Sequence, residues 1–356
     1  MPDQRVMESI IQGAHIGASD IHVMVDSPPA YRINGRLVIR PQDEPIREAD
    51  MMGFIRTIMP GLAAARDLVK HGQADLSISL PDATRARLNV YTCGQSWAAA
   101  IRILPQDVPA LEVLGLPETV SKMTAGSTAG LLLVSGTSGS GKSTTLASLV
   151  NHINRDRPCH IITLEDPVEY LHQNAQAIIN QREVGGDIQT FAQGLRAALR
   201  QDPDIIMVGE MRDLEDISIV LTAAETGHLV LASVHSGSAV QTLERIIDVF
   251  PPHQQQQVRN QAAQALIGII HQKLFPSRDG NGRVLAAEVL VMTPAIRNMV
   301  RSNKMHLIQS ALQTGAAQGM VSMKTAVHKL LEQNKISEQT AFLVAEPPSG
   351  YGYGGL

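Results

Sequence analysis

The segment Gly136-Thr-Ser-Gly-Ser-Gly-Lys-Ser143 has the residue types and the spacing of a loop that binds phosphate groups. Its glycines carry no Cβ atom, so backbone N–H groups can curl around a phosphate without a collision. The apolar run Leu131–Val134 precedes the loop, and the helix-compatible stretch Thr144–Asn154 follows it. A helix that begins at such a loop adds unpaired N–H donors and the positive end of its dipole.

This loop also predicts which side chains bind a nucleotide and its metal ion. Lys142 supplies a point charge for the β- and γ-phosphates, and the Ser143 hydroxyl can bind Mg²⁺. The alternative is a chance glycine-rich turn, which the flanking strand and helix disfavour. We therefore expect ATP or a close relative, with Mg²⁺, at Gly136, Thr137, Ser138, Gly139, Ser140, Gly141, Lys142, Ser143 and Thr144.

An acidic residue follows a second apolar run, at the strand end where open parallel sheets bind their ligands. Ile205–Val208 leads into Gly209 and Glu210, and four apolar residues followed by an acid resemble a Walker B strand. Phosphoryl transfer to water needs an acid that orders the metal ion. We therefore expect Glu210 to lie at the Mg²⁺ site.

A third apolar run, Ile161–Leu164, is followed by Glu165, Asp166 and Glu169. The same reaction needs a group that positions the attacking water, and Glu169 is the candidate. The alternative is that these acids cap and begin a helix, which is common. The phosphate loop upstream on the same predicted sheet favours the catalytic interpretation.

Two histidines flank a further predicted strand, Leu229–Val234: His228 precedes it and His235 follows it. A lone histidine is usually structural. A histidine beside a nucleotide site can instead sense the γ-phosphate, because its charge changes near neutral pH. We favour that role for His235, and for His228 the two interpretations balance.

The elements that must position these residues indicate two domains in a chain of 356 residues. Residues 1–104 contain strands and helices without regular βαβ order, which is typical of an α+β module. Three prolines mark a linker over 105–117. From 118 to 346, strands at 130–135, 160–164, 204–208 and 229–234 alternate with helices at 142–154, 189–200 and 213–226. This α/β pattern predicts a parallel sheet flanked by helices.

For two further segments the sequence predicts a structure but no function. Gln254–Gln272 is predicted to be a helix. Residues 347–356 are rich in glycine, proline and tyrosine, and we expect a disordered tail there.

Composition excludes several classes of protein. The net charge of −4 argues weakly against a protein that coats nucleic acid. The only cysteines, Cys93 and Cys159, form neither a disulfide framework nor a zinc cluster. The N-terminus lacks the apolar run of a signal peptide, and no apolar stretch reaches the length of a membrane span. We therefore expect a soluble cytoplasmic protein with no transmembrane segment.

Four linked motifs make residues 1 to about 340 resemble the secretion-type ATPases of type IV pilus and type II secretion machines. The motifs, which accompany the N-terminal segment Gly17–His22, are the phosphate loop, an "Asp box" at Glu165–Tyr170, a Walker B region at Leu195–Asp213 and a "His box" at Thr222–His228 with His235. Thr293–Arg301 is similar to a C-terminal signature of the pilus-retraction branch. Extension ATPases usually carry four zinc-binding cysteines after Walker B, and this chain has none there.

The resemblance implies a PAS-like N-terminal domain and a RecA-like ATPase core, assembled as a homohexamer. It implies that Glu169 positions or activates water, that Glu210 acts at the Mg²⁺ site, and that Arg87 and Arg102 reach the phosphates when the domains close. Taken without the family, the two arginines would be interpreted as exposed charge on a sheet face.

The activity so implied is ATP hydrolysis that powers pilus retraction and twitching. The implied partner is an inner-membrane platform protein of the PilC type, which would place the protein at the inner face of the cytoplasmic membrane. A related motor for pilus extension or secretion, or a retraction paralogue, is the alternative. A nucleic-acid translocase and a scaffold that binds ATP without splitting it are weaker ones, and no nucleic-acid partner is expected.

Overall fold

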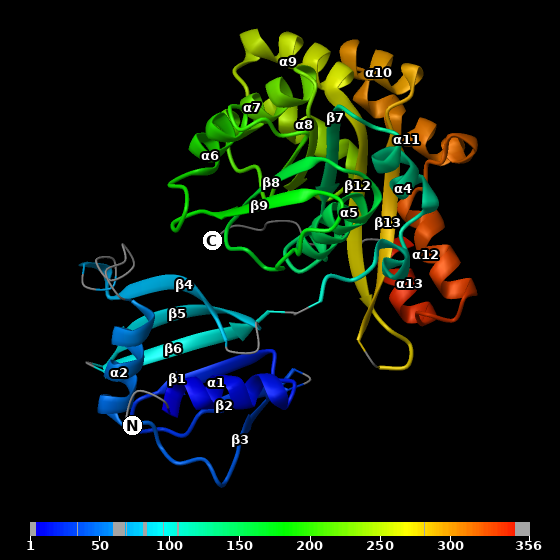
Figure 1. Ribbon diagram of the computed structural model, residues 1–356. Helices are drawn as coiled ribbons and strands as arrows, with labels where there is room; N and C mark the ends of the chain where they lie inside the picture. The colour runs from blue at the N-terminus through cyan, green and yellow to red at the C-terminus, as the bar shows by residue number, and fades with distance from the viewer. Residues whose placement is uncertain are drawn as a thin grey trace, which may run out of the picture. The chain divides into compact units, whose positions relative to one another are not determined.

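The computed structural model describes residues 5–33, 35–59, 68, 70–80, 84–94, 96–104, 107–280 and 282–345 (Figure 1). Contacts divide the chain into two units, Met1–Asp107 with Pro167–Leu171, and Val108–Asp166 with His172–Leu356. Within the second unit, Leu111–Leu114 forms the short 3-10 helix η2. The expected tail at 347–356 lies outside the described residues.

The first unit contains an antiparallel six-stranded sheet in the order β3-β2-β1-β6-β5-β4. Helix α1 approaches β1 closely because Gly13 has no side chain: a Cβ atom there would lie 2.3 Å from Cδ1 of Ile21. Val6, Ile10 and Phe54 of the helices share one core with the sheet. The elements are α1 (Arg5–His15), β1 (Asp20–Met24), β2 (Ala30–Ile33), β3 (Arg36–Ile39), α2 (Glu48–Ile58), β4 (Gln73–Ser79), β5 (Arg85–Cys93) and β6 (Ser96–Ile103).

The second unit is built on a seven-stranded sheet in the order β13-β12-β7-β11-β10-β8-β9. Neighbouring strands from β12 to β9 are parallel, and β13 is antiparallel to β12. The prediction of a mixed α/β fold with a parallel sheet is confirmed. The strands are β7 (Gly130–Ser135), β8 (His160–Glu165), β9 (Ile178–Glu183), β10 (Ile205–Val208), β11 (Leu229–Val234), β12 (Leu266–Pro276) and β13 (Arg283–Val291).

Helices cover both faces of this sheet, so β7, β10 and β11 are buried throughout. One core joins the sheet to α4 (Glu118–Ala125) and α5 (Lys142–Asp156). The other joins it to α6 (Phe191–Ala198), α7 (Leu214–Glu225), α8 (Ala239–Asp248), α9 (Pro252–Ala265), α10 (Pro294–Arg301) and α11 (Met305–Thr314). After a 3-10 turn η3 (Gly315–Gln318), α12 (Met323–Glu332) and α13 (Glu338–Ala345) lie beside β13 (Figure 1). Within the described part of the chain, none of the helices combines the length and apolar character needed to cross a membrane.

The predicted helix Gln254–Gln272 is wrong from Leu266 onward. Helix α9 ends at Ala265, and β12 begins at Leu266 and pairs with β7. The run Leu266–Ile270 is rich in β-branched residues, which favour strands when they are buried. Gly268 permits the close packing, since a Cβ atom there would lie 2.6 Å from Sδ of Met123.

One buried carboxylate, that of Glu288 on β13, binds the beginnings of two helices. Its Oε1 accepts a hydrogen bond from the backbone N–H of Ala239, the first residue of α8, at 2.9 Å. Its Oε2 accepts one from Met323, the first residue of α12, at 3.3 Å. Glu288 therefore satisfies N–H groups that have no partner within their own helices.

Candidate functional site

The predicted phosphate loop connects β7 to α5, with Gly141 as the residue before the helix. Gly136, Gly139 and Gly141 have φ angles of 153°, 74° and 91°, a region that side chains disfavour. At Gly136 a Cβ atom would also lie 2.6 Å from the carbonyl oxygen of Gln272 on β12. The loop therefore needs glycine both for its turn and for its contact with the neighbouring strand.

Lys142, the first residue of α5, folds back over the loop. Its Nζ donates hydrogen bonds to the carbonyl oxygens of Gly136 and Thr137, each at 3.0 Å. The ammonium group is thus held beside the N-terminus of α5, where an anion is favoured. Ser143 follows and is exposed.

The ends of three parallel strands bring together a cluster of charged side chains. The carboxylate of Glu210, just after β10, lies 3.0 Å from Nε2 of His235 and accepts a hydrogen bond from Nε of Arg212 at 3.3 Å. His235 follows β11. Arg212 also pairs with Asp166, which follows β8, at 2.9 Å. Glu210 and His235, predicted separately, are therefore direct partners.

Arg212 is the functional candidate that sequence reasoning missed. Its guanidinium lies over the ring of Phe191, with 5.5 Å between the guanidinium carbon and the ring centroid. Burial lowers the pKa of Arg212, but the carboxylates of Asp166 and Glu210 outweigh this and raise it above its ordinary value. The guanidinium of Arg212 therefore holds the carboxylates of Asp166 and Glu210 in place, at the sheet edge that also carries the phosphate loop.

Glu165, the last residue of β8, is buried and fully engaged in the sheet. Its Oε1 accepts hydrogen bonds from Oγ1 of Thr163 at 2.7 Å and from Nε2 of Gln181 at 3.0 Å. This carboxylate therefore belongs to the support beneath the loop that carries Glu169.

The remaining predicted residues of the active site lie in the first unit or at the other end of the sheet. Arg87 and Arg102 are exposed cross-strand neighbours on β5 and β6, and Nε of Arg102 donates to Asp20 at 2.8 Å. Glu169 lies in Pro167–Leu171, which is grouped with the first unit. These three residues therefore belong to the first unit, whereas the phosphate loop belongs to the second.

His228 lies at the beginning of β11, opposite to the end that carries His235. Its Nδ1 lies 3.0 Å from the carbonyl oxygen of Ala223, and its own carbonyl accepts from the N–H of Gly130, where β7 begins. A six-residue strand is about 20 Å long at about 3.3 Å per residue. Within one chain, His228 is therefore not brought to the phosphate loop.

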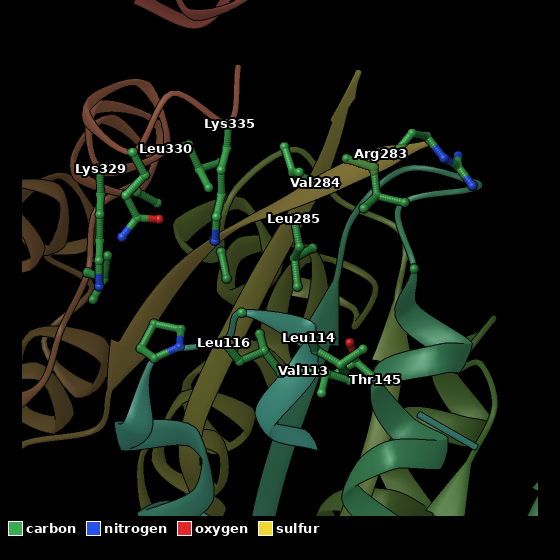
Figure 2. A pocket seen from close by; sticks show the side chains of 18 of the residues that line it. Val113, Leu114, Leu116, Thr145, Arg283, Val284, Leu285, Lys329, Leu330 and Lys335 are labelled. Atoms are coloured by element: carbon green, nitrogen blue, oxygen red, sulfur yellow. The ribbon is translucent and has the colours of Figure 1, made fainter. Parts of the chain in front are cut away.

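A cavity of about 680 Å³ adjoins the start of α5. Its walls include Leu114 and Leu116 on one side and β13 on another, and Figure 2 shows Lys329 and Lys335 extending into it. Arg283, on its rim, donates a hydrogen bond to the carbonyl oxygen of Gly139 in the phosphate loop at 3.3 Å. Apolar walls with a few cations at the rim suit a flat base joined to a charged group.

Two buried polar side chains of β12, those of His271 and Gln272, lie beside the phosphate loop. Nδ1 of His271 lies 3.3 Å from Oγ of Ser135, the residue before the loop, and Nε2 of Gln272 donates to Oγ1 of Thr145 at 2.7 Å. Burial, with the charges of Lys273 and Lys142, lowers the pKa of His271 to about 4. His271 is therefore neutral at physiological pH.

Buried His271 is expected to make the protein sensitive to acid. Because its pKa falls from 6.5 in the unfolded chain to about 4 in the folded one, the unfolded chain binds the extra proton between these values. The unfolding free energy should lose about 2 kcal/mol from this residue between pH 7.5 and pH 5, at about 1.4 kcal/mol per unit below 6.5.

Denaturant unfolding at both pH values, on the natural protein and on His271→Gln, measures this loss. The difference between the two pH values should shrink by about 2 kcal/mol in the variant. His253→Gln, at an exposed position of α9, is the control and should keep the natural difference. An equal pH dependence in all three proteins would contradict the assignment.

Comparisons with known proteins show the family and the fold to which the chain is similar. A family model described as "Type II/IV secretion system protein" matches residues 3–340. A Pseudomonas aeruginosa protein named "Type IV pilus retractation ATPase PilT" is 39% identical over 97% of this chain and 99% of its own length. A Neisseria gonorrhoeae "Twitching motility protein" is 42% identical over 88% of this chain and 83% of its own. A crystal structure of the pilus retraction motor PilT with bound ADP superimposes with a TM-score of 0.89, at 42% identity, over 97% of this chain and 98% of that one.

Proposed function

Because this chain belongs to the type II/IV secretion system protein family, we propose that it is an ATP-hydrolysing motor that powers the retraction of type IV pili. The observation that carries the proposal is the meeting of a glycine-rich phosphate loop with Glu210, His235 and Arg212 at the carboxyl edge of one parallel sheet. Open α/β sheets bind ligands at that edge. Identity of 39–42% over most of the chain to relatives named for retraction and twitching supports retraction as the motor's function.

The second unit would bind the phosphates and the base of the nucleotide at two neighbouring places. Its phosphates would lie against the N–H groups of the loop and the first turn of α5, where Lys142 exchanges its carbonyl partners for phosphate oxygens. Its base would enter the cavity between Leu114, Leu116 and β13, with Arg283 between the two parts. The bound ADP of the PilT structure supports a nucleotide of this class.

Mg²⁺ fits the oxygen donors at this edge of the sheet. The exposed hydroxyl of Ser143 and the half-buried carboxylate of Glu210 are the hard ligands that Mg²⁺ takes, beside phosphate oxygens and water. When bound, the ion would neutralise charge on the phosphates. His235, held by Glu210, would report whether the γ-phosphate is present, and Arg212 would hold Glu210 in position.

The remaining roles complete the reaction of ATP and water to ADP and phosphate. Glu169 would orient or activate the water, and Arg87 and Arg102 would reach the phosphates when the units close. The first unit would be a PAS-like domain and the second a RecA-like core. His228, at the far end of β11, would act outside the nucleotide site of its own chain.

The assembly that this function requires is a homohexamer in the cytoplasm, at the inner face of the cytoplasmic membrane. A membrane platform protein of the PilC type would receive the motion. Exchange of phosphate contacts at hydrolysis would then change the angle between the units and turn the ring.

Deletion of the gene tests this proposal. Deleted cells should carry more surface pili than the parent and should not twitch, and a plasmid copy of the natural gene should restore both properties. Cells without pili would instead identify an extension motor, and normal pili with normal twitching would indicate a paralogue or a secretion motor. ATPase activity that needs DNA and falls steeply with salt would favour a translocase.

A further inference from the structure

A single side chain of the neighbouring strand hydrogen-bonds to the residues on both sides of the loop that carries Glu169. That side chain is Gln181 of β9, which lies beside Thr163 in the register of β8 and β9. Its Nε2 donates to Oε1 of Glu165 at 3.0 Å, and its Oε1 accepts the backbone N–H of His172 at 2.8 Å. Glu165 and His172 are the residues on either side of the Asp166–Leu171 loop.

Both ends of this bridge are themselves fixed. Glu165 is buried at the end of β8 and accepts a second hydrogen bond, from Oγ1 of Thr163. His172 is largely buried, and that burial lowers its pKa to about 4, so its ring carries no charge at neutral pH. The amide of Gln181 thus joins two well-packed points across the base of a short loop.

We propose that Gln181 is a positioning residue for ATP hydrolysis, which acts by holding the base of the loop and thereby the place of Glu169. The inference rests on the proposed function, because it takes Glu169 as the group that positions water. A side chain that orients water must be placed to within a fraction of an ångström, and a shift of about 1 Å can cost about 100-fold in rate. Asp166, at the start of the loop, has a second attachment to Arg212, so loss of Gln181 should loosen the loop rather than release it.

Gln181→Met removes both hydrogen bonds at nearly constant volume. We expect kcat for ATP to fall about tenfold while KM changes by less than about twofold, because the phosphate loop is untouched. The matched control is Asn180→Leu on the same strand. The amide of Asn180 lies 2.9 Å from Nε2 of His160, and adjacent residues of a strand point to opposite faces, so kcat should stay within about twofold of the natural value.

Two further measurements separate positioning from a general effect on folding. Hydrogen exchange of the His172 amide should become about tenfold faster in Gln181→Met and stay unchanged in Asn180→Leu, since only the first loses the acceptor of that N–H. Single-turnover rates should show that Gln181→Met adds nothing to Glu169→Gln, because the two act on the same step.

The outcomes distinguish this inference from the proposed function. If the natural protein does not hydrolyse ATP, the proposed function of the site fails. If Glu169→Gln keeps full kcat, the water-positioning role passes to another acid and the premise of this inference fails. If both of those tests succeed but Gln181→Met has the kcat of Asn180→Leu, or its loss multiplies with that of Glu169→Gln, the positioning role of Gln181 is overturned. Unchanged exchange at His172 would overturn the bridge itself.

Discussion

Lys142→Ala should weaken ATP binding by about 100-fold and reduce turnover below detection. The natural side chain carries a charge to the N-terminus of α5 and is held there by the carbonyl oxygens of Gly136 and Thr137. Bonds from a charged donor contribute about 1.5–3 kcal/mol each, and about 1.4 kcal/mol changes an equilibrium tenfold. Isothermal titration with ATP and a phosphate-release assay measure the two effects.

A matched lysine provides the control for this variant. Lys122 is exposed on α4 and pairs with Glu118 one turn earlier, an interaction worth at most about 0.5 kcal/mol. Lys122→Ala should bind and hydrolyse ATP as the natural protein does. Unimpaired ATP binding by Lys142→Ala would refute the assignment of residues 136–144 as the phosphate site.

Glu169→Gln should separate binding from hydrolysis. The amide keeps the size of the side chain but cannot take a proton from water, and removal of a general base costs about 10²–10⁴ in rate. We expect kcat to fall by at least about 100-fold while the dissociation constant for ATP stays within about twofold. Steady-state kinetics and titration with a non-hydrolysable ATP analogue give both numbers.

Glu215→Gln is the corresponding control for a lost carboxylate. Glu215 forms an exposed ion pair with Arg196 on the surface of α6 and α7, where such pairs contribute little. Its kcat should match the natural enzyme. If Glu169→Gln turned over ATP at the natural rate, the water-positioning role would pass to another acid.

The strands beneath the phosphate loop could be predicted because they are buried on both faces. Both strands lie inside the sheet: Leu131–Val134 is an unbroken apolar run, and Leu229–Val234 is apolar except for Ser233. Strand β12 could not be predicted in the same way. Leu266–Ile270 follows α9 without a turn residue, and periodicity alone does not distinguish a buried strand from the continuation of a helix.

The chemistry of the candidate site was predictable only where a motif of known spacing carried it. The loop residues and the strand-end acid Glu210 follow such motifs. The partners that organise them do not: Arg212, Arg283 and Gln181 are ordinary surface-type residues in the sequence, and their roles depend on which carboxylate or carbonyl the fold brings near. The role of His228 stays a prediction: the sequence places it before β11, and within one chain its printed contacts are with Ala223 and Gly130.

Glu288 ties together two regions that the chain order keeps apart. Helix α8 follows the segment after His235, and α12 carries residues that line the cavity beside the phosphate loop. Since both helices begin on the same carboxylate, the α12 wall of the cavity and the segment after His235 have a common anchor. A shift of α8 relative to α12 would break at least one of the two hydrogen bonds to Glu288. One buried side chain therefore sets the distance between the start of α8 and the start of α12, and with it the spacing of two regions that border the phosphate loop.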